Sequence, residues 1–191
     1  ISIDTPFQRL MDIERQLAET GLVKSAIVSP TVSDNGGTRL AQLGQAAAAH
    51  LAETLRDGDI LGISGGKAVA AVVDALRVER PIDVQVVPLT GGVQGKFHTD
   101  VNNLASRMAE RLGGRSLQLH APLFAERAEQ REMLMNLGAV KEVLDLARRA
   151  TACLFGIGSI TQPGSSYIDL HPLSAPDRAM LPGLGVMAEF L

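Results

Sequence analysis

The chain has 191 residues, of which 46% are hydrophobic and 20% charged, so a folded domain with a sizeable core is expected and intrinsic disorder is excluded. Aromatic residues make up 3% and the net charge is −3, which argues against a base-stacking surface and a basic footprint for nucleic acid. The single cysteine, Cys153, rules out an internal disulfide and fits a reducing cytoplasm, and no apolar run is long enough to cross a membrane.

Two helices and one short strand are predicted in the first part of the chain. Apolar residues recur at steps of three and four over residues 6–18, which predicts an amphipathic helix. The apolar residues 26–28, closed by Ser29 and Pro30, predict a short buried strand. A second helix is predicted over residues 38–55, where a run of alanines allows close packing against a neighbour.

In the rest of the chain, short apolar runs alternate with helical patterns. Strands that are apolar throughout are typical of a parallel sheet covered on both faces. Because parallel crossovers are right-handed, the predicted fold class is α/β with a doubly wound, mostly parallel sheet, and Cys153 is expected to be buried in its last strand. The predicted strands are residues 60–63, 84–89, 117–119 and 152–155, and the predicted helices are residues 66–76, 100–112, 125–135 and 140–149.

The turn after the first of these strands, Ser64-Gly65-Gly66-Lys67, leads directly into a helix. Backbone N–H groups at a helix start are unpaired, the helix dipole adds positive potential, and glycines let an anion come close to the backbone. The turn therefore predicts a phosphate site, while a simple tight connection between strand and helix is the alternative. It is not a Walker A loop, because Leu61 and Ala68 stand where that motif needs glycine and a hydroxyl residue.

Glycine or proline also follows the other three strands, in Gly91-Gly92, Ala121-Pro122 and Gly156-Ile157-Gly158-Ser159. Since ligands of doubly wound sheets bind beyond the carboxyl ends of the strands, these loops are expected to surround one site. Asp100 suits the N-cap of the following helix, and Asn102 lies in the first turn of that helix. A capping role and hydrogen bonds to sugar hydroxyls are both compatible with these two residues.

The loop Gly156-Ile157-Gly158-Ser159 begins like a dinucleotide-binding fingerprint. The sixth position of the pattern is Thr161 instead of glycine or alanine, and Gln162-Pro163-Gly164 follows instead of a helix, so NAD binding is not expected. None of the four histidines has metal-ligand spacing with another histidine, the cysteine or a carboxylate, so a metal site is not expected either. No cofactor is therefore predicted.

Taken in order, these segments resemble the effector-binding domain of the SorC family of bacterial transcriptional regulators. The resemblance implies a Rossmann-like fold similar to that of sugar-phosphate isomerases and CoA transferases. It also implies that a phosphorylated sugar, polyol or related metabolite binds the domain and changes the contacts of a homodimer or homotetramer. The resemblance covers nearly the whole chain and is carried by residues 22–30, 43–49, 57–67, 86–92, 102–109, 121–124 and 156–159.

The resemblance also implies an organisation and a set of ligand contacts. The chain is expected to be one effector-binding domain over residues 1–191, with a linker helix at residues 6–18 and a truncated C-terminal end. Operator DNA is expected to be bound only by a helix-turn-helix that would precede residue 1. Many family members carry a hydroxyl residue where Ala68 stands. By position, the phosphate is assigned to Ser64, Gly65, Gly66 and Lys67, the sugar to Gly91, Gly92, Asp100 and Asn102, and the far side of the pocket to Gly156, Ile157, Gly158 and Ser159.

The predicted function is that of a cytoplasmic ligand sensor without catalytic residues, in a regulator of sugar or polyol catabolism. The alternative is a sugar-phosphate isomerase of the same fold, which needs a general base beside the substrate carbon. Asp100 is the one carboxylate that the sequence places in the loops, and the glycine loops lack a paired acid and base. The sensor hypothesis is therefore preferred.

Overall fold

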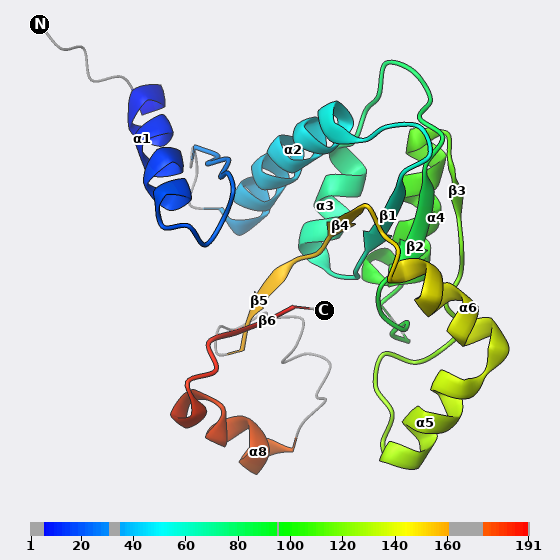
Figure 1. Ribbon diagram of the computed structural model, residues 1–191. Helices are drawn as coiled ribbons and strands as arrows, with labels where there is room; N and C mark the ends of the chain where they lie inside the picture. Colours follow the sequence, from blue (N-terminus) through cyan, green and yellow to red (C-terminus); the bar gives the residue numbers. More distant parts are fainter. Residues whose placement is uncertain (1–5, 31–34, 95, 161–173, 191) are drawn as a thin grey trace, which may run out of the picture.

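A four-stranded parallel sheet forms the centre of the molecule, with helices on both of its faces (Figure 1). This computed structural model describes residues 6–30, 35–94, 96–160 and 174–190. The strands are β1 (Ile60–Ile63), β2 (Gln85–Pro88), β3 (Arg115–Ser116) and β4 (Ala152–Leu154). Their order across the sheet is β3-β2-β1-β4, and β1 pairs in parallel with both β2 and β4.

The path of the chain places helices on opposite faces of the sheet. From β1 the chain moves outward to β2 and β3, and it then crosses back over the sheet to β4. With right-handed crossovers, the helices after β1 and β2 cover one face and the helices after β3 cover the other. The first face carries α3 (Lys67–Ala75) and α4 (Val101–Leu112), and the second carries α6 (Gly138–Ala147), against which α5 (Ala128–Asn136) packs. The predicted doubly wound α/β sheet is confirmed.

The larger hydrophobic core lies between the sheet and helices α3 and α4. A further helix, α2 (Gly36–Thr54), packs against α3. These two helices come closest at Gly44, where a Cβ atom would lie 2.6 Å from the carbonyl oxygen of Ala71. The fully buried side chains of this core include Leu61, Ile63, Val86, Leu104 and Met108.

A smaller core lies on the opposite face of the sheet, under α6. Leu119, Val140 and Val143 are buried in it.

The prediction that Cys153 is buried is wrong, because β4 pairs only with β1 within the described residues and the cysteine is exposed at this edge of the sheet.

The N-terminal segment contains one of its two predicted elements. Helix α1 (Pro6–Glu19) is present and ends one residue beyond the prediction. The predicted strand at residues 26–28 is wrong, since these residues form no strand and Ile27 is 52% exposed. The N–H group of Val28 donates instead to Oε1 of Glu14 at 2.7 Å, so this segment is held by α1 rather than by a neighbouring strand.

The third predicted strand is displaced, since β3 covers Arg115–Ser116 and not residues 117–119. The N–H group of Leu117 still donates to the carbonyl oxygen of Val86 at 3.0 Å, so the ladder continues for one bond past β3. Beyond that bond, the backbone of Leu119 pairs with a side chain of α4 in place of a strand.

The chain after β4 also differs from the prediction. Residues 156–159 are predicted as a loop, but Ile157–Ser159 forms strand β5, which pairs antiparallel with β6 (Ala188–Phe190). Between them lie α8 (Ala175–Met180) and the short 3₁₀ helix η2 (Pro182–Leu184). Thr161 and residues 162–164, on which the dinucleotide motif fails, lie outside the described residues.

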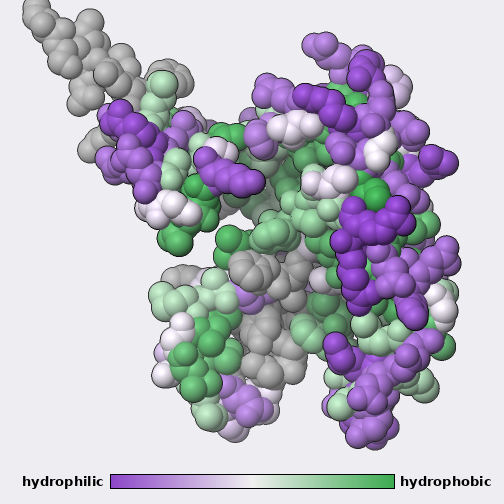
Figure 2. All heavy atoms as spheres, in the orientation of Figure 1, coloured by the Kyte–Doolittle hydropathy of each residue, from purple (hydrophilic) through white to green (hydrophobic). Residues whose placement is uncertain are grey.

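Apolar side chains gather on the surface of the C-terminal segment that contains α8 and η2 (Figure 2). Met180, Leu184 and Met187 are 60%, 70% and 81% exposed there. In the described ranges of the chain, no helix is both long enough and apolar enough to span a bilayer.

Candidate functional site

The predicted loops meet at the carboxyl-end edge of the sheet, where backbone hydrogen bonds join them in pairs. Ser64 joins the turn after β1 to the end of β4, since its N–H group donates to the carbonyl oxygen of Leu154 at 3.0 Å. Ser64 is fully buried, and its Oγ donates to the carbonyl oxygen of Gly65 at 3.1 Å. Both donors of Ser64 are thus used to anchor the turn.

The two glycines of this turn let the 3₁₀ helix η1 (Phe97–Thr99) lie directly on it. Gly66 has a φ of +110°, a conformation that favours glycine, and its N–H group donates to the carbonyl oxygen of Thr99 at 2.9 Å. A Cβ atom at Gly65 would lie 2.8 Å from the same oxygen. The N–H group of Gly66 is therefore engaged within the protein, whereas those of Ala68 and Val69, in the first turn of α3, have no acceptor within the helix.

Lys67 and Gly92 of the second loop line separate hollows. The Lys67 side chain borders a groove of about 480 Å³, together with Asp74 of α3, His98 of η1 and Arg107 of α4. Arg107 and Asp74 form an ion pair there. A second hollow of about 380 Å³ is lined by Gly92, Val93, Gln94, Asp100, Asn102, Leu119, His120, Ala121 and Pro122.

The loop after β2 is bound to the loop after β3. The N–H group of Gly92 donates to the carbonyl oxygen of Ala121, and the N–H group of Leu123 donates to that of Gly92, both at 2.9 Å. Gly91 has no room for a side chain, because a Cβ atom there would lie 2.2 Å from the carbonyl oxygen of Pro122. The two loops therefore form one unit at this edge of the sheet.

The capping role considered for Asp100 is confirmed. Its Oδ1 accepts the N–H groups of Asn102 at 3.0 Å and Asn103 at 3.4 Å, as an N-cap of α4 does. Its Oδ2 accepts the N–H group of Val93 at 2.9 Å. Both oxygens of this carboxylate therefore hold the second loop against the start of α4.

The side chain of Asn102 is also engaged within the protein. Its Oδ1 accepts the N–H group of Leu119 at 2.8 Å, and its Nδ2 donates to the carbonyl oxygen of Leu119 at 3.1 Å. The neighbouring Asn103 differs, since its Oδ1 is buried without a hydrogen-bond partner in the described part of the chain. Whether Asp100 and Asn102 also contact a ligand stays a prediction.

Strand β5 pairs with a strand that carries an acidic residue, Glu189, which is not among the predicted site residues. Gly158 pairs with Glu189 of β6, and a Cβ atom at Gly158 would lie 2.2 Å from Oε1 of Glu189. The Oε2 atom of Glu189 is buried and has no hydrogen-bond partner among the described residues. Loss of hydration on burial raises the pKa of this carboxyl above its ordinary value. In the sequence, Glu189 could have been noticed as the single charged residue within the apolar segment of residues 184–191.

On the other side of β5, Gly156 faces the start of α3. A Cβ atom at Gly156 would lie 3.4 Å from the Cβ of Ala68. The turn after β1 and Gly156 therefore meet at the first turn of α3, and glycines at the start of a helix beside a parallel sheet are typical of anion-binding sites.

Comparison with known proteins decides the family. Residues 5–191 match the family described as "Putative sugar-binding domain". The chain belongs to this family, as the sugar-binding domain of a SorC-type protein. The structure of the full-length sorbitol operon regulator SorC from Klebsiella pneumoniae is similar to it, with a TM-score of 0.88 and 25% identity over 100% of this chain and 62% of that protein. The predicted family is confirmed.

The sequences of curated SorC-type proteins agree with this assignment. The erythritol catabolism regulatory protein EryD of Brucella abortus is 29% identical, over 98% of this chain and 60% of its own length. The sorbitol operon regulator of Klebsiella pneumoniae is 28% identical, over 83% of this chain and 51% of its own length. The chain thus spans about half to three fifths of the length of these relatives.

Proposed function

We propose that this SorC-type domain is the ligand-sensing part of a bacterial transcriptional regulator of sugar or polyol catabolism, and that its ligand is phosphorylated. The relatives support the class of ligand, because they are named for erythritol catabolism, the sorbitol operon and deoxyribonucleosides. The observation that carries the proposal is that Gly156 lies against Ala68 in the first turn of α3, and that Gly158, two residues further along the chain, pairs with the half-buried Glu189 of β6.

The phosphate is assigned to the first turn of α3. The N–H groups of Ala68 and Val69 have no acceptor within the helix, and the helix dipole favours an anion at this end. Gly156 lies opposite, close to Ala68, so the backbones of two loops border the same space. Ser64 and Gly66 hold the turn in position, and Lys67 flanks it with its side chain in the adjoining groove.

The hydroxyl groups of the ligand are assigned to the hollow beside Gly92 and to Glu189. A buried carboxyl oxygen without a partner is poised to form a hydrogen bond with a ligand hydroxyl. Asp100 and Asn102 border the hollow and hold its loops together. The proposed site comprises Ser64, Gly65, Gly66, Lys67, Gly91, Gly92, Asp100, Asn102, Gly156, Ile157, Gly158 and Ser159, with Glu189 added.

The signal is proposed to be a shift between two arrangements of a homodimer or homotetramer in the cytoplasm. A ligand shifts such an equilibrium only by the difference between its affinities for the two arrangements. The exposed apolar residues of α1, Met11 and Leu17, and those around η2 are candidate contacts between copies. Helix α1 would link the domain to an operator-binding helix-turn-helix elsewhere in the protein.

The second candidate function is a sugar-phosphate isomerase. It is favoured by one observation, the buried Oε2 atom of Glu189, which has no hydrogen-bond partner among the described residues. Loss of hydration raises the pKa of this carboxyl, and enzymes use carboxyl groups with a raised pKa to exchange protons with a substrate. Asp100 does not compete for this role, since its two oxygens already accept three backbone N–H groups that hold the loop and cap α4. Turnover of pentose or hexose phosphates that is abolished by Glu189→Gln would replace the sensor proposal with this one.

The experiment is a thermal-shift comparison of erythritol, sorbitol and deoxyribose with their phosphorylated forms. Binding adds RT ln(1 + [L]/Kd) to the stability, about 2.7 kcal/mol at a hundredfold excess over Kd. Ala68→Asp places a carboxylate at the second position of α3 and should abolish the response to the phosphorylated ligand. Ala139→Asp makes the same change at the second position of α6, away from the site, and should leave the response intact.

Two results would contradict the proposal. One is an equal response to the free and phosphorylated forms, which would show that the phosphate group does not contribute to binding. The other is an unchanged response of the Ala68→Asp variant, which would show that the phosphate does not bind at the start of α3. Lys67→Ala is expected to weaken binding less than Ala68→Asp does, because the Lys67 side chain lines the groove beside Asp74.

A further inference from the structure

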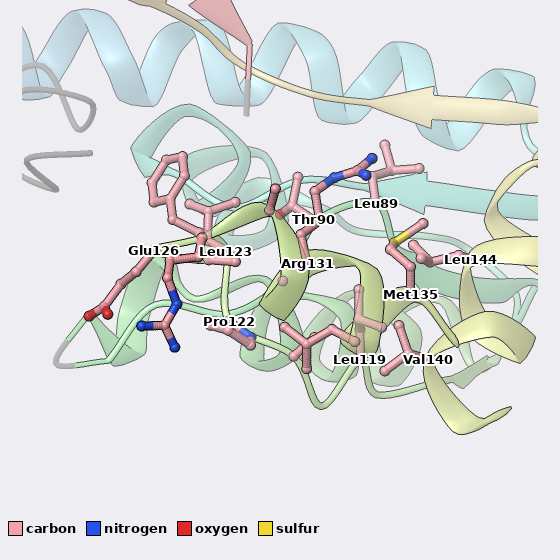
Figure 3. A pocket seen from close by; sticks show the side chains of 17 residues that line it. Leu89, Thr90, Leu119, Pro122, Leu123, Glu126, Arg131, Met135, Val140 and Leu144 are labelled. Carbon is pink, nitrogen blue, oxygen red and sulfur yellow. The ribbon is translucent and has the colours of Figure 1, made fainter. Parts of the chain in front are cut away.

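A cavity of about 470 Å³ lies on the opposite face of the sheet from α3, between the carboxyl end of β2 and helices α5 and α6 (Figure 3). Its volume falls within the range of about 300–1,000 Å³ that small-molecule pockets occupy. The cavity reaches Thr90 and Gly91 at one end and passes under α5 toward α6. Its apolar lining includes Leu119, Leu134, Met135, Val140 and Leu144.

The cavity is open because α5 stands away from the sheet. None of the α5 residues is buried, although Leu134 and Met135 are half-buried over the cavity. Protein interiors are close-packed, and an apolar space that nothing fills lowers stability. An apolar group that entered this space would gain the contacts that the surrounding side chains lack.

One end of the cavity is basic. Figure 3 shows the Arg131 side chain extending from α5 toward Leu89, at the end where Thr90 lies. Within the described ranges, no carboxylate lies at ion-pair distance from Arg131, and the carboxylate of Glu126 lies at the other end of the view. An arginine without a carboxylate partner at the mouth of an apolar space is suited to bind an anionic head group through two parallel hydrogen bonds.

We propose that this cavity is a second small-molecule site, which takes an amphipathic anion with an aliphatic body and a single carboxylate. The aliphatic body lies against Leu119, Val140 and Leu144, and the carboxylate lies between Arg131 and Thr90. This site is separate from the phosphate assignment at α3, so either proposal stands if the other fails. It adjoins the loop unit formed by Gly91, Gly92 and Pro122, which both sites share.

The test is a titration of the methyl-labelled protein with sodium octanoate, followed by NMR. Saturable shifts are expected for the methyl groups of Leu119, Val140 and Leu144, and not for those of Leu61 in the larger core. Octanol, which has the same chain without the charge, should bind about tenfold more weakly, since a hydrogen-bonded charge pair contributes about 1.5–3 kcal/mol.

Two arginine variants locate the head group. Arg131→Gln keeps most of the stem and should weaken octanoate binding about tenfold. Arg148→Gln changes an exposed arginine that pairs with Asp145 and does not line the cavity, and it should leave the affinity unchanged. Ala128→Leu narrows the cavity and should weaken octanoate and octanol alike. The proposal is overturned if octanol binds as tightly as octanoate, if Arg131→Gln binds octanoate normally, or if the three methyl groups do not shift.

Discussion

The side-chain amide of Asn102 pairs with the backbone of Leu119 as a neighbouring strand would. The N–H group of Leu119 donates to Oδ1 at 2.8 Å, and Nδ2 donates to the carbonyl oxygen of Leu119 at 3.1 Å. Leu119 is 3% exposed, so water is a poor substitute for the amide. The pair joins the first turn of α4 to the chain after β3, just before the loop that contains Pro122.

Loss of this amide should destabilise the protein. Asn102→Ala leaves two buried backbone groups of Leu119 without partners and is expected to lower the free energy of unfolding by about 2–3 kcal/mol. Asn103→Ala is the matched control in the same helix turn, because Oδ1 of Asn103 is buried without a partner among the described residues. It should change stability by less than about 0.5 kcal/mol. Urea unfolding measures both, and equal losses would show that the Leu119 pair is not what Asn102 contributes.

The contact between the second and third loops depends on the absence of a side chain at Gly91. Gly91→Ala would bring a Cβ atom within 2.2 Å of the carbonyl oxygen of Pro122. The loops must separate, and the expected loss of stability is about 2–3 kcal/mol. Gly138→Ala, at the open first position of α6, should instead add about 0.5 kcal/mol. Denaturant midpoints that move in the same direction for both variants would refute this account of Gly91.

The packing of α2 on α3 likewise requires a residue without a side chain at position 44, which is Gly44. Gly44→Ala places a Cβ atom 2.6 Å from the carbonyl oxygen of Ala71, so the helices must move apart at a cost of about 1–3 kcal/mol. Gly36→Ala, in the first turn of the same helix with open space around it, is the control and should be neutral or slightly stabilising. Thermal unfolding of the two variants makes the comparison, and a neutral Gly44→Ala would mean that the helices are not in tight contact.

Glu189 should make stability fall as the pH rises. Burial raises the pKa of its carboxyl above the ordinary value of 4.5, so the folded state holds a proton that the unfolded state has lost. Between the two pKa values the folded state binds more protons, and stability therefore decreases with pH through that window. Glu189→Gln removes the ionisation and should flatten this fall, leaving the variant more stable than the parent at neutral pH.

The measurement is the urea midpoint of the parent, Glu189→Gln and Glu142→Gln from pH 4.5 to pH 8. Glu142 is exposed on α6, so its variant should follow the parent. If Glu189→Gln also follows the parent, the carboxyl is not desolvated in the folded protein.

A phosphorylated ligand that binds Glu189 through a hydroxyl should show reduced affinity for Glu189→Gln. The variant should still bind the phosphorylated form of the ligand more tightly than the free form.

The sequence alone predicts the elements whose signals lie within a few residues. Ile60–Ile63 is predicted with its observed bounds, and α3 and α4 are predicted to within one residue at each end. The capping role of Asp100 is of the same kind, since its partners are Asn102 and Asn103. The predicted strand at residues 26–28 is wrong because an apolar run does not say whether a partner strand exists.

The composition, the local hydrophobic patterns and the order of the glycine loops determined the fold class, the family and the edge of the sheet where a ligand is expected. Only the tertiary structure decided how the residues at that edge are used. In the folded protein, Asn102 pairs with Leu119, and Lys67 lines a groove together with Asp74. Glu189 of β6 pairs with Gly158 of β5. The physical reason is that hydrophobic periodicity is local, whereas strand pairing, side-chain direction and the loss of hydration depend on residues that are distant in the chain.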